Sequence, residues 1–330
     1  MTEQCPIPLE NKNNLESIRN WCGIRGTDDL VVEIGSEKNK ENLNNILIDP
    51  AHHSREETIT AMLLNYSGEA YGDGQWNKTT GGWTTPEVIT QYGEMREIHP
   101  EFAALSLDTG FMTHLPEFVE MLEKGEITST DPIIARNELK EKLGYKIMWR
   151  GTMLTDEELA MAKSDGIMSP LSIYAKNSDK PKEQFESIAL STYANFTIEK
   201  HFHGEHHLTP LVSVSEYEDV ATAVGRHFGN KPQDKKFYLF KLKMPIIDLI
   251  TYKEHAVKTP SKLQESIERN PEYSISISLN DKESEYKWDE KVESYIFWKI
   301  DPDEILEIKQ PNIAKSTWNG KTTTTNNYAQ

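Results

Sequence analysis

The sequence has little cysteine and no long hydrophobic run. Cys5 and Cys22 are the only cysteines among 330 residues, too few for a disulfide framework or a cysteine-built metal cage. We interpret them as free thiols, which indicates folding in a reducing, aqueous compartment. No stretch approaches the roughly 18 apolar residues of a membrane-spanning helix, and the first residues lack the basic and apolar regions of a Sec signal peptide.

Positive charges are outnumbered by negative ones. The chain has 36 Lys and Arg residues against 53 Asp and Glu residues, a formal net charge of −17. A surface of that sign repels a nucleic-acid backbone, and the sequence has no local basic patch of useful size. We therefore expect no nucleic-acid partner. A small anionic cofactor is not excluded, because it needs only one or two well-placed cations.

Helix patterns come first along the chain. Ser54 and Glu57 have the spacing of a capping box and predict a helix near 54–67, and Thr155 with Glu158 predicts a second one that stops near Gly166. Apolar residues spaced by about 3.6 positions predict further helices. These lie within residues 86–95, 115–125 and 133–144.

Strand patterns follow from about residue 145. Runs rich in β-branched and aromatic residues occupy 145–149, 211–214, 237–242 and 294–300. Helices followed by strands favour an α+β fold over a regular alternation of strand and helix. We expect a mainly helical N-terminal region over 1–138, a core over 139–311, and a flexible tail over 312–330, where threonine and asparagine dominate.

Three polar residues lie at or beside predicted strands. Arg150 ends the first strand, Ser213 lies in Leu-Val-Ser-Val-Ser, and Glu293 immediately precedes the apolar run to Ile300. Each has an ordinary interpretation when taken alone: a surface arginine, a strand serine and a solvated glutamate. Their order along the chain is more informative than any one of them.

In that order they resemble the signature of the mono-ADP-ribosyltransferase toxins of the cholera-toxin-like class, which is Arg, then Ser-Thr-Ser, then Glu-x-Glu. The stretch LVSVSEYEDVATAVG (211–225) is similar to the serine strand and following helix of that family. The stretch ESYIFWKIDPDEILEI (293–308) is similar to the strand after its catalytic glutamate. The resemblance covers about residues 140–310 and leaves the N-terminal 135 residues uncovered.

The resemblance implies an ADP-ribosyltransferase-like core of two packed, mostly antiparallel sheets around an NAD cleft. It implies NAD-dependent mono-ADP-ribosylation of a protein by a bacterial toxin or effector, made in a bacterial cytoplasm and translocated into a host cell. NAD would be a substrate, no metal would be needed, and a host activating protein stays open as a partner. The N-terminal region would then recognise the target or cover the cleft.

The resemblance also assigns roles to single residues. Glu293 would stabilise the oxocarbenium-like ribose as the nicotinamide bond breaks, Arg150 would bind the pyrophosphate, and Ser213 would hold Glu293. Further cofactor-binding candidates are Gly151, Ser215, Phe202 and Tyr217. The candidates on the acceptor side are Tyr286, Trp288, Glu290 and Lys291.

Two positions depart from the family pattern. Val214 replaces the middle threonine, whose side chain points to the opposite face of the strand from its neighbours. Lys291 stands where arginine-modifying members carry Glu or Gln, and it would repel an acceptor guanidinium. Either Glu290 replaces the missing group or the acceptor is not arginine. Glu290 as the catalytic carboxylate is a further alternative that fits the spacing to Ile300 less well.

Other functions stay open. Water as the acceptor would make the protein an NAD glycohydrolase, and loss of activity would leave an inactive binding module with the same fold. Four histidines between residues 201 and 207 could indicate a metal-dependent hydrolase. They lack the HExxH order, however, and Gly204 interrupts them, so no metal ligand is assigned.

Overall fold

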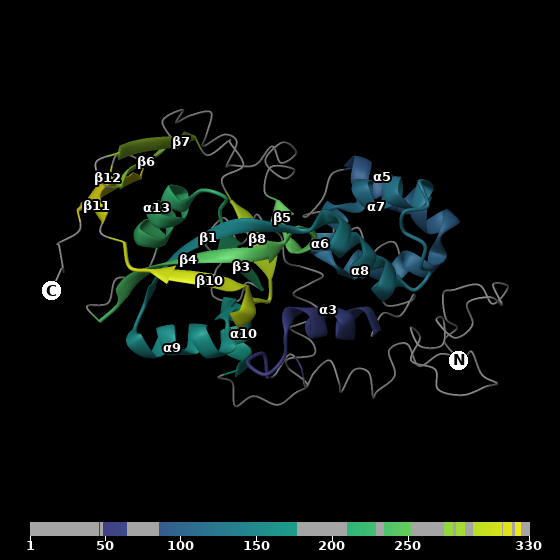
Figure 1. Cartoon of the computed structure of the whole chain (residues 1–330), viewed down its shortest axis with the longest axis horizontal. Coiled ribbons are helices and arrows are strands. Elements are labelled where there is room, and N and C mark those ends of the chain that lie inside the picture. The colour runs from purple at the N-terminus through teal and green to yellow at the C-terminus, as the bar shows by residue number, and fades with distance from the viewer. Residues whose placement is uncertain are drawn as a thin grey trace.

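The computed structural model describes residues 46, 49–64, 86–176, 210–228, 234–251, 274–279, 282–287, 293–311, 313–318 and 321–324. Within these ranges the protein is a mixed fold of helices and small antiparallel sheets, as the predicted α+β class requires. One group of helices gathers at one end of the molecule, and the sheets occupy the other (Figure 1).

The helical group precedes the first strand. Its elements are α3 (Arg55–Leu64), α5 (Pro86–Ile98), η2 (Pro100–Leu107), α6 (Thr109–Thr113), α7 (Leu115–Glu123) and α8 (Pro132–Leu143). The predicted capping box of α3 is confirmed, because Glu57 N donates to Ser54 Oγ at 3.1 Å and Ser54 N donates to Glu57 Oε2 at 2.7 Å. A buried apolar cluster with Phe102, Phe111 and Phe118 packed edge to face holds these helices together.

In the part of the chain that the structure describes, the strands form four small sheets, and the strand pairs there are antiparallel. The first sheet has the order β1 (Tyr145–Leu154), β4 (Lys236–Pro245), β10 (Ile305–Lys309). The second has the order β3 (Leu211–Val214), β8 (Ser294–Phe297), β5 (Ile250–Thr251). The third pairs β2 (Ile167–Met168) with β9 (Lys299–Ile300), and the fourth has the order β12 (Lys321–Thr324), β11 (Ile313–Trp318), β6 (Ser274–Leu279), β7 (Lys282–Lys287).

Further helices lie among the strands. They are α9 (Asp156–Asp165), α10 (Pro170–Lys176), α13 (Glu218–Phe228), η4 (Ile246–Asp248) and η5 (Pro302–Glu304). The predicted capping box of α9 is confirmed, because Thr155 Oγ1 and Glu158 exchange hydrogen bonds with each other's backbone N–H groups. Gly166 follows α9 at a positive φ of 90°, as predicted for its end.

Two sequence-based expectations were wrong in detail. Residues 313–318 and 321–324 form β11 and β12, within the range predicted as a flexible tail. Threonine is β-branched and suits a strand once β6 offers a partner. The run 294–300 is not one strand, because Trp298 adopts a φ of 68° and separates β8 from β9.

A buried ionic network joins the helical group to the strands. Asp248, in η4, accepts from Arg55 Nη2 at 2.7 Å and from Arg136 Nη2 at 2.6 Å. Arg136 also pairs with Asp108, the N-cap residue of α6, and Arg55 also pairs with Glu304. Arg136 is 1% exposed, so these charges are withdrawn from water.

The two guanidinium groups keep Asp248 ionised. Burial would raise the pKa of Asp248, but the positive charges of Arg55 and Arg136 outweigh burial and hold that pKa below its usual range. A neighbouring lysine completes the junction, since Lys299 Nζ donates to the carbonyl oxygens of Pro50 and His53 at 2.9 Å each. The chain before α3 is thereby bound to β9.

Removal of the central arginine tests this junction. Arg136→Met would leave Asp108 without its ion pair and Asp248 with one guanidinium in place of two, and loss of one partner of a buried pair costs about 3–5 kcal/mol. We expect urea denaturation to report a loss of that size. Lys124→Ala breaks the exposed pair with Glu120 and should change stability by less than about 0.5 kcal/mol. Equal effects of the two variants would contradict the assigned role.

Candidate functional site

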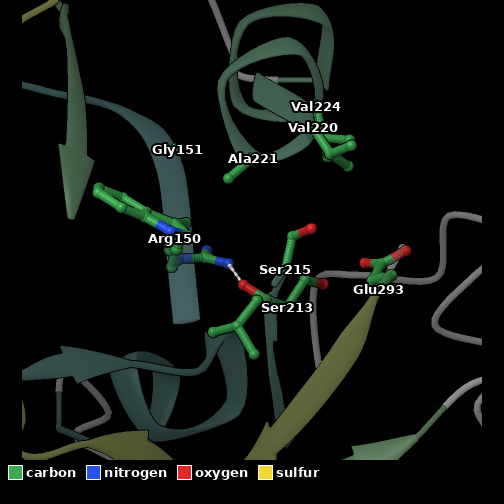
Figure 2. A pocket seen from close by; sticks show the side chains of 10 residues that line it. Arg150, Gly151, Ser213, Ser215, Val220, Ala221, Val224 and Glu293 are labelled. Carbon is green, nitrogen blue, oxygen red and sulfur yellow. Dashed lines mark hydrogen bonds between the residues drawn. The ribbon is translucent and has the colours of Figure 1, made fainter. Parts of the chain in front are cut away.

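A short backbone bridge brings β1 to the end of β3. Trp149 N donates to Ser215 O at 2.7 Å, and Ser215 N donates to Trp149 O at 2.8 Å. The bridge lies on the edge of β1 that β4 does not occupy. The next residue on β1, Arg150, therefore reaches β3, and its Nη1 donates to the carbonyl oxygen of Ser213 at 2.6 Å (Figure 2).

The pairing of β3 with β8 then places Glu293. Ser213 lies opposite Tyr295 in the antiparallel register, and Glu293 comes two residues before Tyr295 in the chain. Because side chains alternate along a strand, Glu293 and Tyr295 share one face. The Ser213 hydroxyl group hydrogen-bonds the Glu293 carboxyl group, and both residues line one pocket.

These groups line one pocket with an empty volume of about 320 Å³. Its polar wall consists of Arg150, Ser213, Ser215 and Glu293, and its apolar wall comes from α13 (Figure 2). The full lining is Trp149, Arg150, Gly151, Ser213, Val214, Ser215, Val220, Ala221, Val224 and Glu293.

The two charged residues of the pocket have shifted acidity. Burial raises the pKa of Glu293 to about 7, although the neighbouring Ser213 and Tyr295 hydroxyl groups and the charge of Arg150 act in the opposite direction. Burial lowers the pKa of Arg150 to about 10, against the raising effect of Glu293. Arg150 Nε is buried and has no hydrogen-bond partner among the described residues. The pocket thus holds a cation with spare donor capacity beside a carboxyl group that titrates near neutrality.

Gly151 allows α13 to approach β1 closely. A Cβ atom on Gly151 would lie 2.1 Å from the carbonyl oxygen of Ala221, and one on Gly225 would lie 2.2 Å from the carbonyl carbon of Gly151. A methyl group at either position would push the helix away from the strand. Close packing of α13 on β1 therefore explains why residue 151 is glycine. Gly151, a cofactor-binding candidate from the sequence, also lines the pocket.

The other cofactor candidates have different locations. Ser215 lines the pocket, and its Oγ accepts from Tyr217 N at 3.2 Å. Tyr217 is 39% exposed and is not among the lining residues. Phe202 lies outside the described residues.

On the acceptor side, only Tyr286 has a described backbone position, in β7 opposite Ile275. Trp288, Glu290 and Lys291 lie outside the described residues, and so does the histidine-rich stretch 201–207. The alternatives that involve Glu290, Lys291 or a histidine metal site therefore stay predictions.

Tyr295, which pairs with Ser213 across the strands, is a neighbour of the site that the sequence analysis did not name. In an apolar strand it has the appearance of a core aromatic residue, and it is fully buried. The signal that could have found it is strand alternation, because a residue two positions after Glu293 must share its face once β8 is assigned.

The described part of the chain has neither a metal-binding cluster nor a membrane-spanning helix. Its His, Cys, Asp and Glu side chains form no group of three or more that could hold a metal ion. None of its helices combines the length and the apolar character needed to cross a bilayer.

Comparisons with protein-family models, with curated proteins and with solved structures give no match. The interpretation of the pocket therefore depends on its own geometry and on the order of its residues in the sequence.

The close contact between α13 and β1 predicts a large difference between two glycine variants. Gly151→Ala should destabilise the protein by about 1–3 kcal/mol, because the new methyl group collides with backbone. Gly93→Ala, inside α5 with nothing within 4 Å of the new methyl group, should stabilise it by up to about 1 kcal/mol. Chemical denaturation of both variants measures the contrast, and a neutral Gly151→Ala variant would show that the helix can shift without cost.

Proposed function

We propose that this protein is an NAD-dependent mono-ADP-ribosyltransferase that modifies a protein, with a core of the ADP-ribosyltransferase type. One observation carries the proposal. Arg150, Ser213 and Glu293 were selected from the sequence by their order, although 63 and 80 positions separate them, and all three line the same pocket. The family resemblance requires such a convergence, so the shared pocket supports the proposal.

The state of Arg150 supports an anionic ligand. Its side chain is partly buried, its Nε atom is fully buried, and its described hydrogen bond goes to a neutral carbonyl group. A positive charge that is partly removed from water gains stability from a charge-assisted contact with an incoming anion. The pyrophosphate of NAD supplies such an anion, and the pocket would enclose only the part of the dinucleotide nearest the reacting bond.

The position of Glu293 supports the bond-breaking step. The glycosidic bond between ribose and nicotinamide breaks with its electron pair passing to the nicotinamide nitrogen, which becomes neutral. The positive charge that develops on the ribose would be stabilised by the ionised carboxylate. A nucleophilic atom of the acceptor protein then bonds to the ribose carbon and loses its proton.

Replacement of Glu293 tests the function. Wild type and Glu293→Gln would be incubated with labelled NAD and a eukaryotic cell lysate, and both nicotinamide release and label on protein would be measured. We expect the variant to lose both signals by at least about 100-fold, the usual cost of removing one transition-state contact of this kind. Glu307→Gln, an exposed carboxylate on β10, is the matched control and should stay within about twofold of wild type.

The outcomes separate the alternatives. Release of nicotinamide without label on protein would identify an NAD glycohydrolase. Binding of NAD without release, with or without lysate, would identify an inactive binding module. Full activity of Glu293→Gln would refute the assignment of the catalytic carboxylate.

The acidity of Glu293 predicts the pH dependence of the reaction. With a pKa of about 7 in the free enzyme, the carboxyl group is mostly protonated at pH 6 and mostly ionised at pH 8. We therefore expect kcat/KM to rise through an acidic limb centred near pH 7. The measurement is nicotinamide release between pH 5 and pH 9. The residual activity of Glu293→Gln should lack this limb, and a limb that persists in the variant would belong to another group.

A further inference from the structure

We propose that an exposed face of the first sheet is a docking surface for the acceptor protein, and that it binds an acidic segment of that protein. This surface, the lysine–aromatic face, consists of Tyr145, Ile147 and Trp149 on β1 with Lys241 and Lys243 on β4. The identity of the partner as the acceptor rests on the proposed function, whereas the surface itself does not.

The strand register places these five side chains on one side of the sheet. Every second residue of β1 from Tyr145 onward faces that side, and Ile147 and Trp149 lie opposite Lys243 and Lys241 in the register. The other side of the sheet packs against α9, while α13 lies on the side of Trp149 (Figure 1). The lysine–aromatic face therefore shares its side of the sheet with α13.

The helix leaves part of this side open. It covers β1 at Gly151, where its backbone approaches too closely for a Cβ atom. Before that point Tyr145 is 47% exposed and Ile147 is 42% exposed. A large aromatic ring and an aliphatic side chain next to each other on a strand can anchor a protein partner, which removes them from water.

The charge of the face indicates the chemistry of that partner. Lys243 Nζ lies 4.4 Å from the centre of the Tyr145 ring, and Lys241 Nζ lies 5.7 Å from the centre of the Trp149 ring. Neither lysine pairs with a carboxylate in the described part of the chain. In a chain of net charge −17, two such ammonium groups form a local site for carboxylates.

The small number of free cations favours a protein over other anions. Lys309 Nζ also approaches the Trp149 ring, at 4.8 Å, but it lies 3.5 Å from Glu218 and 3.7 Å from Glu307. A nucleic-acid backbone or an anionic membrane binds strongly only where several unpaired cations act together. A protein segment needs only one or two carboxylates for the lysines and an apolar side chain for Ile147.

Trp149 connects the face to the pocket. It belongs to the exposed row on β1 and is also among the residues that line the pocket. Arg150, the proposed pyrophosphate ligand, follows it directly in the chain. A protein bound on the face would therefore lie beside the proposed NAD site, which favours the acceptor as the occupant.

A direct binding measurement tests the face without reliance on catalysis. A fluorescein-labelled random copolymer of glutamate and tyrosine would be titrated with the full chain, and fluorescence anisotropy would report binding. We expect wild type to bind, and Lys243→Glu and Ile147→Asp each to weaken binding by about tenfold or more, the size of one interface hot spot. The matched controls are Lys163→Glu, at an exposed lysine on α9, and Ile173→Asp, at a residue 41% exposed on α10.

Both controls should bind as wild type does. An absence of binding by wild type, or an equal loss in a face variant and its control, would overturn the inference. Tighter binding of a labelled single-stranded DNA or of phosphatidylserine vesicles than of the copolymer would also overturn it. Sedimentation velocity tests a second copy of this chain as the occupant: an oligomer that Ile147→Asp dissociates would assign the face to self-association instead.

Protein labelling connects the face with the proposed function. With labelled NAD and a eukaryotic cell lysate, we expect Lys243→Glu to lower the label on protein by about tenfold or more. Its dissociation constant for NAD, measured by calorimetry, should stay within about twofold of wild type. A parallel loss of NAD affinity would indicate a disturbed pocket and overturn acceptor docking. Copolymer binding through the face by a protein that neither releases nicotinamide nor labels protein would refute the proposed function and leave the docking surface standing.

Discussion

The buried ion pairs of Asp248 with Arg55 and Arg136 are the constraint on which the arrangement of the described chain depends. Each arginine comes from a helix that precedes the first strand, and Asp248 comes from the turn after β4. Burying an isolated charge at this depth would cost more free energy than the net stability of a typical folded protein. The helices and the strands must therefore meet in one relative position, in which every charge has its partner.

The same network bears on the pocket. Asp248 lies two residues before Ile250, and Ile250 pairs with Tyr295 on the strand that follows Glu293. Lys299, in β9 just after that strand in the chain, donates hydrogen bonds to the chain before α3. The short strand β8 therefore lies between two segments that contact the helical group or the chain before it: the segment of Asp248 leads into β5, and the segment of Lys299 follows β8. This arrangement gives the helical group a role in site geometry without a contact to the pocket.

Local patterns were enough to predict much of this. The capping boxes at Ser54 and Thr155 act within one helical turn, and apolar spacing predicted α5, α7, α8 and the main strands. The ion pairs of Arg55 and Arg136 could not be predicted, because 193 and 112 positions separate them from Asp248. Tyr295 was missed for a related reason: its ring matches an apolar strand, and only the pairing with β3 places it opposite Ser213.

Trp298 has a consequence for the alignment of these strands. Its left-handed conformation is costly for a bulky side chain, by about 1–3 kcal/mol, and it forces β8 to end after four residues. Its backbone is also held in place, since Trp298 N donates to Pro210 O immediately before β3. A slip of β8 by one residue would turn Glu293 and Tyr295 to the opposite face. The bend at Trp298 acts as a stop against that slip, so the strained residue sets which side chains of β8 can face Ser213.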